Sequence, residues 1–260
     1  MSHHDKKFRV GAVSYLNTVP LVWGMLHGPQ RPRVDLRFSI PSLCAAEVEA
    51  GESDIGLVPT AEIARQGLQI VPGAGIAATW PVRSILMFSK VPWREVKTLA
   101  ADLSSRTSVE LAKVVLRERF GAEPLILTNE PNLRSMMQLA DAALIIGDPA
   151  LRIDPQREEF EWLDLAAEWV AMTNLPMVFA AWAGKPGIPV EALRGLTLDS
   201  YQLGKEHLGD IIEQEHRKRG ITKDLAGHYL RHNICFEIGD KERQGMEMFW
   251  SMAGLVGATA

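Results

Sequence analysis

The sequence has little of what marks several large classes of protein. It contains two cysteines, Cys44 and Cys235, which lie far apart and lack the C-x-x-C spacing of zinc and redox sites. We therefore expect both thiols to be reduced packing residues, as buried free cysteines usually are. No run approaches the roughly 18 apolar residues that a membrane-spanning helix needs, so we expect no contact with a membrane.

The sequence also lacks an excess of basic residues. It has 28 Lys and Arg against 32 Asp and Glu, a net charge of −4, whereas a general nucleic-acid binder should carry a basic stripe. Residues 1–9 hold no apolar core of the kind found in secretory signals. We expect a cytoplasmic protein without a nucleic-acid partner, and the sequence leaves monomer and homodimer open.

Most motifs of cofactor-dependent enzymes are missing. There is no Walker-type phosphate loop, no G-x-G-x-x-G after a strand and no G-x-S-x-G nucleophile elbow. His228 and His232 have helical i, i+4 spacing, but no metal motif places a third ligand with them. The sequence therefore predicts no metal site and no cofactor.

The sequence does contain a regular alternation of strand and helix patterns. Residues 41–62 and 131–150 share one order: a capped helix, an acidic turn, an apolar strand and a polar tip. A chain of 260 residues suits two lobes of similar construction. This alternation predicts an α/β fold with mainly parallel sheets and a ligand cleft at the carboxyl ends of the strands.

The expected crossings between the lobes follow two apolar strands. The strand Ile85–Ser89 precedes Lys90-Val91-Pro92, and the strand Met177–Trp182 returns the chain. These crossings predict lobe I over 1–90 and 183–260, and lobe II over 91–182. Helical patterns near 199–219, 223–232 and 241–255 complete lobe I.

Polar residues gather where predicted strands end and helices begin. Hydroxyl groups ahead of helices are donors, and the first helical turn leaves backbone N–H groups free, so together they form a cradle for an anion. Arginines beside them would add carboxylate contacts. The simpler alternative is that the hydroxyls only cap helices. The candidate substrate-binding residues are Ser14, Tyr15, Ser42, Thr60, Arg83, Ser84, Ser104, Ser105, Arg106, Thr107, Ser108 and Asp148.

Six segments of the sequence together form a recognisable pattern. They are 10–20 (VGAVSYLNTVP), 54–59 (DIGLVP), 82–89 (VRSILMFS), 102–108 (DLSSRTS), 145–148 (IIGD) and 175–183 (LPMVFAAWA). Together they resemble the menaquinone biosynthesis family that includes the chorismate dehydratases, and the resemblance runs from about Phe8 to the C-terminal helix. Asn174, before Leu-Pro, and Trp80, before Pro81, depart from the family pattern at the rim of the site.

The resemblance implies a class II periplasmic-binding-protein-like fold and a cytoplasmic role on the futalosine route to menaquinone. The S-Y-L-N opening resembles the dehydratase branch, in which the asparagine of this motif lies in the active site, and this implies a catalytic role for Asn17. The implied substrate is the small dianion chorismate, dehydrated without a cofactor. Two alternatives stay open: the sister enzyme acting on cyclic dehypoxanthine futalosine, and a carboxylate-binding protein without catalysis.

Overall fold

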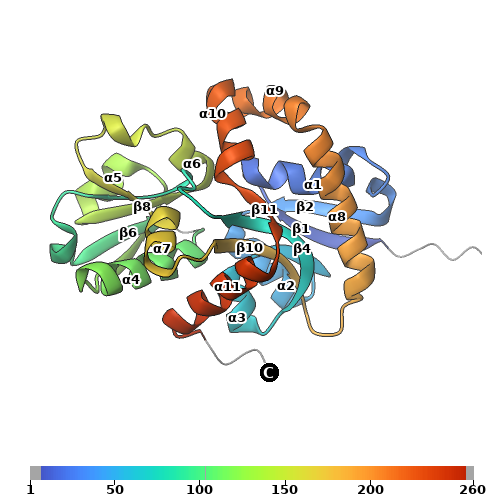
Figure 1. Ribbon diagram of the computed structural model, residues 1–260, viewed down its shortest axis with the longest axis horizontal. Coiled ribbons are helices and arrows are strands. Elements are labelled where there is room, and N and C mark those ends of the chain that lie inside the picture. Colours follow the sequence, from blue (N-terminus) through green and yellow to red (C-terminus); the bar gives the residue numbers. More distant parts are fainter. Residues whose placement is uncertain (1–6, 103, 256–260) are drawn as a thin grey trace, which may run out of the picture.

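The computed structural model describes residues 7–102 and 104–255, which form two β-sheets side by side, each with helices around it (Figure 1). We call each sheet with its helices a lobe. The six-stranded first sheet has the order β11-β4-β10-β3-β1-β2. Its strands are β1 (Phe8–Val13), β2 (Val34–Ser39), β3 (Ile55–Pro59), β4 (Gln69–Ala78), β10 (Met177–Gly184) and β11 (Cys235–Ile238).

The five-stranded second sheet has the order β7-β6-β8-β5-β9. Its strands are β5 (Ile85–Ser89), β6 (Thr98–Asp102), β7 (Leu125–Asn129), β8 (Ala142–Ile146) and β9 (Glu161–Asp164). In β5, Ile85 and Met87 belong to the large core, whereas Leu86 and Phe88 belong to a smaller one. Because successive side chains of a strand point to opposite faces, this sheet is buried on both sides.

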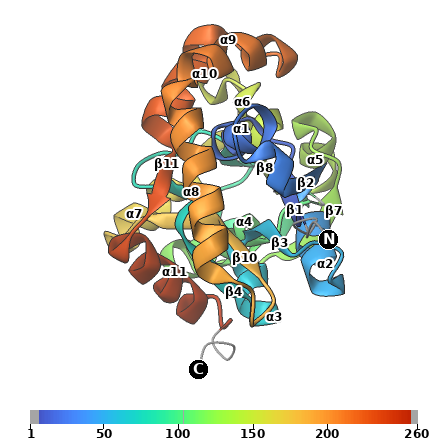
Figure 2. The same cartoon turned by 90° about the vertical axis from the view of Figure 1, so that its right-hand side faces the viewer.

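Helices surround both sheets. α8 is amphipathic and packs on α1 and β4, and Figure 2 shows it running along the outside of the first lobe. The helices are α1 (Val19–His27), α2 (Pro41–Ala50), α3 (Thr60–Gln66), α4 (Thr107–Phe120), α5 (Leu133–Leu139), α6 (Gly147–Leu151), α7 (Leu165–Thr173), α8 (Val190–Glu206), α9 (Leu208–Lys218), α10 (Lys223–His228) and α11 (Asp240–Met252).

The internal similarity predicted from the sequence is confirmed. The units α2-β3-α3 and α5-β8-α6 each place a helix before an inner strand, and a short helix begins directly after that strand. The inner strands β3 and β8 are apolar and fully buried. The carboxyl end of each strand therefore opens into a helix start on the side facing the other lobe.

The sheets are mixed rather than mainly parallel. Parallel pairs join β1 with β2 and β3, and β6 with β7 and β8. By contrast, β10 pairs antiparallel with β3, and β5 pairs antiparallel with β8. The physical reason is that β5 and β10 each enter their sheet from the other lobe and run opposite to the strands beside them. The lobe limits at 90 and 183 stay a prediction, and the pairing of β5 in the second sheet and β10 in the first favours earlier crossings.

The C-terminal helices differ from the predicted ones at two points. The helical pattern expected over 199–219 breaks at His207, which separates α8 from α9. The pattern expected over 223–232 begins as α10 and continues as a π-helical turn, Tyr229–Asn233. Amphipathic periodicity extends across both changes, so it does not reveal them.

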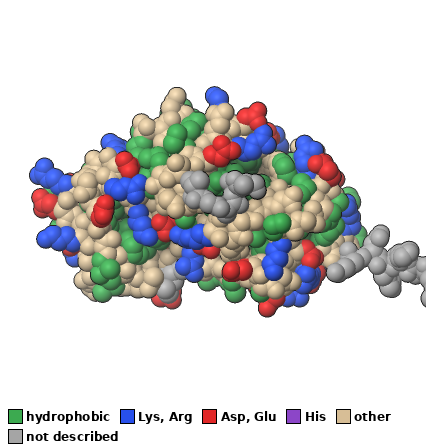
Figure 3. Space-filling view, turned by 90° about the horizontal axis from the view of Figure 1, so that it is seen from below, with side chains coloured by type: hydrophobic (Ala, Val, Ile, Leu, Met, Phe, Trp, Pro, Cys, Tyr) green, Lys and Arg blue, Asp and Glu red, His purple; other side chains and the backbone are tan. Residues whose placement is uncertain are grey.

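The surface carries charges of both signs. On the face shown in Figure 3, Lys and Arg side chains are interspersed with Asp and Glu across both lobes. Within residues 7–102 and 104–255, no helix is long and apolar enough to cross a membrane.

Two glycines of α8 test the packing of this helix on α1. A Cβ atom at Gly204 would lie 2.0 Å from the backbone oxygen of Pro20, whereas one at Gly195 would meet nothing within 4 Å. Gly204→Ala should therefore lower the free energy of unfolding by about 1–3 kcal/mol or more. Gly195→Ala should raise it by about 0.5–1 kcal/mol, because alanine favours a helix interior. Urea denaturation measures both, and equal effects would contradict the close packing.

Candidate functional site

A polar turn follows β1 and supplies one wall of a cavity between the two sheets. Asn17 lies in the 3₁₀ turn Leu16–Thr18 and is 7% exposed. Its Nδ2 donates to the hydroxyl of Tyr229 at 3.0 Å, and its buried Oδ1 has no partner among the described residues. The amide is therefore anchored at one end and presents an unused acceptor.

The start of α4 supplies the opposite wall. Its N-cap is Arg106, whose side chain makes no capping hydrogen bond. The first turn of a helix leaves backbone N–H groups without helical acceptors and carries a partial positive charge. The Ser105 hydroxyl is buried here without a partner in the described chain. This helix start therefore offers donors and positive potential to an anion.

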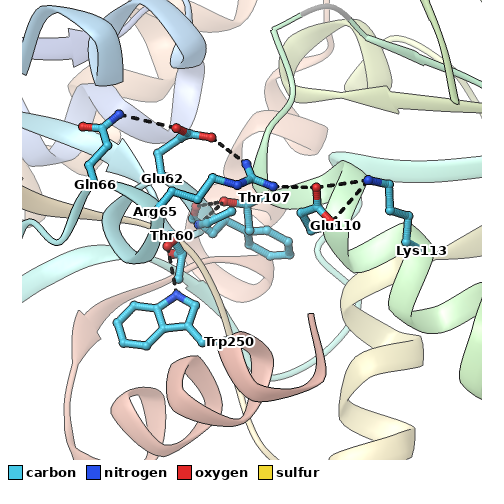
Figure 4. A network of polar contacts seen from close by, with 10 residues as sticks. Thr60, Glu62, Arg65, Gln66, Thr107, Glu110, Lys113 and Trp250 are labelled. Atoms are coloured by element: carbon cyan, nitrogen blue, oxygen red, sulfur yellow. Dashed lines mark hydrogen bonds and ion pairs between the residues drawn. The ribbon is translucent and has the colours of Figure 1, made fainter. Parts of the chain in front are cut away.

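Thr107 fixes the start of α4 against the first sheet. Its buried hydroxyl accepts from Ala61 N at 3.1 Å and donates to the carbonyl of Phe179 at 3.2 Å. Figure 4 shows Thr107 close to α3, with Arg65 nearby placed between Glu62 and Glu110. Because Arg65 lies on α3 and Glu110 on α4, this ion pair also joins the two lobes.

Ser84, the residue just before β5, also lines the cavity. The turn before it is held by Asp164, whose carboxylate accepts from Val82 N at 3.0 Å and Arg83 N at 2.6 Å. Arg83 has a φ of 66°, a conformation uncommon outside glycine, so these bonds hold a strained turn. The Ser84 hydroxyl accepts from the hydroxyl of Tyr229 at 2.9 Å.

Tyr15 closes one end of the cavity. Its hydroxyl lies 3.2 Å from Ser104 Oγ, and its ring covers Gly147, where an added Cβ would come within 2.6 Å of the ring. Burial raises the pKa of Tyr15 to about 12, so the phenol is neutral at physiological pH. Glycine at position 147, with a φ of 65°, is what permits this close approach.

Together these walls line a pocket with about 540 Å³ of empty space, part of which is open to solvent. Its lining combines apolar side chains with a few polar groups, as small-molecule sites usually do. Tyr15 and Arg106 are the titratable side chains among the lining residues that the structure describes. The lining residues are Val13, Tyr15, Asn17, Pro41, Leu57, Pro59, Ile76, Ser84, Ile85, Ser105, Arg106, Thr107, Ser108, Ile146, Gly147, Phe179 and Ala180.

Comparison with known sequences decides the family. A profile of the family described as menaquinone biosynthesis matches residues 8–254. The chain belongs to this menaquinone biosynthesis family. A chorismate dehydratase of Thermus thermophilus is 26% identical over 268 residues, which cover 96% of each chain. A chorismate dehydratase of Campylobacter jejuni is 26% identical over 250 residues, covering 92% of this chain and 94% of the relative.

Solved structures confirm the periplasmic-binding-protein-like fold of this family member. A protein of Archaeoglobus fulgidus superposes with a TM-score of 0.78 at 16% identity, covering 97% of this chain and 98% of its own. The periplasmic aliphatic sulphonate binding protein SsuA of Escherichia coli gives a TM-score of 0.63 at 12% identity, covering 94% and 87%. At these identities the likeness concerns the fold alone.

Seven of the predicted site residues line the cavity of this family member. They come from the turn after β1, from the start of β5 and from the start of α4, so the structure brings together segments that are far apart in the sequence. The seven are Tyr15, Asn17, Ser84, Ser105, Arg106, Thr107 and Ser108.

The other predicted site residues do not line the cavity. Ser14 is exposed, and its carbonyl accepts from Arg219; Ser42 is half-buried within α2. Thr60 is fully buried, with its carbonyl accepting from Trp250. Ser104 lies just behind the wall, where its hydroxyl donates to Asp102.

The two charged members of this group are held by other parts of the protein. Arg83 donates to the carbonyls of Ala150, at 3.0 Å, and Ile153. A carboxylate clamp at this position would have to break these bonds. Asp148 accepts from Leu16 N at 3.0 Å and pairs with Arg219 at 2.7 Å. Asp148 thus ties α6 to the other lobe.

The sequence analysis did not find three residues that shape the site. Tyr229 reaches Asn17 across 212 residues of sequence, Arg219 reaches Asp148 across 71, and Gly147 stands beside the predicted Asp148. The I-I-G-D pattern contained a signal for Gly147, since glycine after a strand often permits a close approach. In the described chain, no group of three His, Cys, Asp or Glu residues could hold a metal ion, and His228 and His232 are both exposed.

The variants Arg83→Ala and Arg106→Ala should differ clearly in their free energy of unfolding. Arg83→Ala removes hydrogen bonds to two carbonyls and should cost about 1.5–3 kcal/mol of unfolding free energy. Arg106→Ala removes an exposed side chain that makes no capping hydrogen bond and should change the free energy of unfolding by about 0.5 kcal/mol or less. Chemical denaturation of both variants measures the difference, and a larger loss for Arg106→Ala would contradict these placements.

Proposed function

We propose that the protein is a chorismate dehydratase, which converts chorismate to 3-[(1-carboxyvinyl)oxy]benzoate and water on the futalosine route to menaquinone, in the cytoplasm. The observation that carries this proposal is the cavity in which the uncapped start of α4 faces Asn17 and Ser84. Membership in the menaquinone biosynthesis family and two relatives named chorismate dehydratase support it.

The start of α4 is suited to bind a carboxylate of the substrate. Chorismate carries two carboxylates, and one of them fits the free N–H groups at the start of α4 beside Arg106. The cavity lies between apolar side chains such as Leu57, Ile76 and Phe179. Charge–dipole interactions are stronger in such a water-poor space than in solution. The helix start can therefore hold a carboxylate without a large excess of basic residues.

The chemical half is a loss of water from neighbouring ring carbons. The proton leaves the carbon that bears the enol ether, and its electron pair spreads through the conjugated diene toward the ring carboxylate. Hydroxide leaves the neighbouring carbon, takes up that proton as water, and the ring becomes aromatic. The protein stabilises the spreading negative charge with oriented donors and excludes bulk water.

The proton acceptor that the cavity favours is the substrate itself. Among the described lining residues, Tyr15 and Arg106 are both poor bases, since the pKa of Tyr15 is raised to about 12 and a guanidinium offers donors but no acceptor. The enolpyruvyl carboxylate lies near the proton in chorismate and can carry it to the leaving hydroxide. Asn17, with its free Oδ1, orients the groups that exchange this proton.

Incubation of the purified protein with chorismate tests the proposal directly. Mass spectrometry should show loss of one water per substrate, and the rate should be unchanged by EDTA because no step uses a metal. Binding without turnover would favour the non-catalytic carboxylate-binding protein. Turnover of cyclic dehypoxanthine futalosine in place of chorismate would favour the sister enzyme.

Asn17 gives the sharpest test of the site. Asn17→Asp removes the N–H group that donates to Tyr229 and places an anion before a dianionic substrate, so turnover should fall by more than about 10²-fold. Asn17→Ala, which adds no charge, should be less impaired. Single-turnover dehydration measures both, with thermal melting as the folding control. Asn17→Asp turnover within about threefold of wild type, with normal melting, would remove Asn17 from the chemistry.

A further inference from the structure

Tyr229 connects two polar residues of the cavity wall, Asn17 and Ser84. It is the first residue of the π-helical turn after α10, and its side chain is 1% exposed. Its hydroxyl lies 3.0 Å from Asn17 Nδ2, in the first lobe, and 2.9 Å from Ser84 Oγ, at the start of β5. The phenol itself does not line the cavity, whereas Asn17 and Ser84 do.

The protons available to Asn17, Tyr229 and Ser84 fix the direction of the two hydrogen bonds that join these side chains. Asn17 Nδ2 can only donate, so the phenol oxygen accepts from it and turns its single proton toward Ser84 Oγ. The Ser84 hydroxyl is then an acceptor on its Tyr229 side, and its own proton is free to point into the cavity. The Asn17 Oδ1, which has no partner in the described chain, stays an acceptor. The three side chains thus leave Ser84 with a free donor and Asn17 with a free acceptor.

The surroundings of Tyr229 keep this polarity constant with pH. Burial, with added repulsion from Asp148 and Asp164, raises the pKa of Tyr229 well above its ordinary value. The phenol therefore keeps its proton throughout the physiological range and does not act as an acid or base in turnover. The backbone fixes its place as well, because the π-helical turn is closed by a bond from Ile234 N to Tyr229 O at 3.2 Å.

We propose that Tyr229 is a positioning residue that, through one hydrogen-bond chain, makes Ser84 a donor and Asn17 an acceptor toward the reacting part of the substrate. This inference rests on the proposed dehydration of chorismate. Ser84 then hydrogen-bonds the oxygen on which negative charge grows or the departing hydroxide, while Asn17 Oδ1 orients the carboxyl group that carries the proton. The carboxylate clamp at α4 does not involve Tyr229.

The test uses Tyr229→Phe, which keeps the ring and removes the hydroxyl. We expect kcat for chorismate to fall by about 10–100-fold, because Ser84 and Asn17 lose their fixed polarity. KM should stay within about threefold, because the contacts at α4 are untouched. The matched control is Tyr201→Phe, another buried tyrosine of the first lobe that packs on Phe236 and should keep wild-type kinetics.

A double-mutant cycle separates this role from a merely structural one. If Tyr229 acts through Ser84 and Asn17, the loss of kcat in the Ser84→Ala/Tyr229→Phe protein should be clearly smaller than the product of the two single losses. Losses in kcat that multiply, or a Tyr229→Phe kcat within about threefold of wild type, would overturn the proposal. So would a KM increase that accounts for the whole loss in kcat/KM.

The same four proteins of the cycle also distinguish the two proposals. A wild-type protein without chorismate turnover would overturn the proposed function. Their free energies of unfolding would then report whether the hydroxyls of Tyr229 and Ser84 are coupled at all. Additive losses of stability, with no coupling between the two positions, would overturn the hydrogen-bond chain and with it the positioning role.

Discussion

The site depends most on the buried hydroxyl of Thr107. It accepts from Ala61 N at 3.1 Å and donates to the Phe179 carbonyl at 3.2 Å, so the first residue of α4 is fastened to α3 and β10 of the other lobe. Buried hydrogen bonds with both partners satisfied are costly to break, because opening the contact would leave two backbone groups unpaired. The N–H groups that follow Thr107 are thereby fixed in the cavity wall, where an anion can meet them.

Other contacts also join the two lobes, in addition to the hydrogen bonds of Thr107. The Tyr15 and Ser104 hydroxyls meet at 3.2 Å, and the Asp148–Arg219 pair at 2.7 Å adds a half-buried ionic contact on another side. Hydrogen bonds from Lys218 and Arg219 lower the pKa of the neighbouring Glu215 despite its burial. This carboxylate contributes stability above its unfolded pKa and loses that contribution as pH falls through its lower folded pKa. Exposed pairs such as Arg65 with Glu110 contribute less.

Local sequence was enough to predict the elements that build the cavity. A polar residue next to an apolar run, as with Asn17 after β1 and Ser84 before β5, shows where a strand opens toward a ligand. The run DLSSRTS likewise predicted a helix start, which became the α4 wall with Arg106 and Thr107. Leu103 of this run lies outside the described residues. These segments are short and locally determined, so composition and spacing describe them well.

Contacts between residues that lie far apart in the sequence could not be predicted in the same way. Arg83 looked like a carboxylate clamp because it lies beside Ser84, yet carbonyls 67 and 70 residues away accept its guanidinium. Tyr229 lies in what the sequence shows only as an amphipathic helix, and only the packed fold brings it to Asn17. The strands that cross between lobes made the sheets mixed, because their pairing depends on the whole chain.

The most direct test of this account is a crystal structure of the Asn17→Ala protein with chorismate bound. The account predicts a substrate carboxylate against the backbone N–H groups at the start of α4, near Arg106. It also predicts that the hydroxyl-bearing ring carbon faces Ser84, while the Tyr229 hydroxyl stays within hydrogen-bond distance of Ser84 Oγ. Chorismate bound outside this cavity, or bound with its carboxylates away from α4, would contradict it.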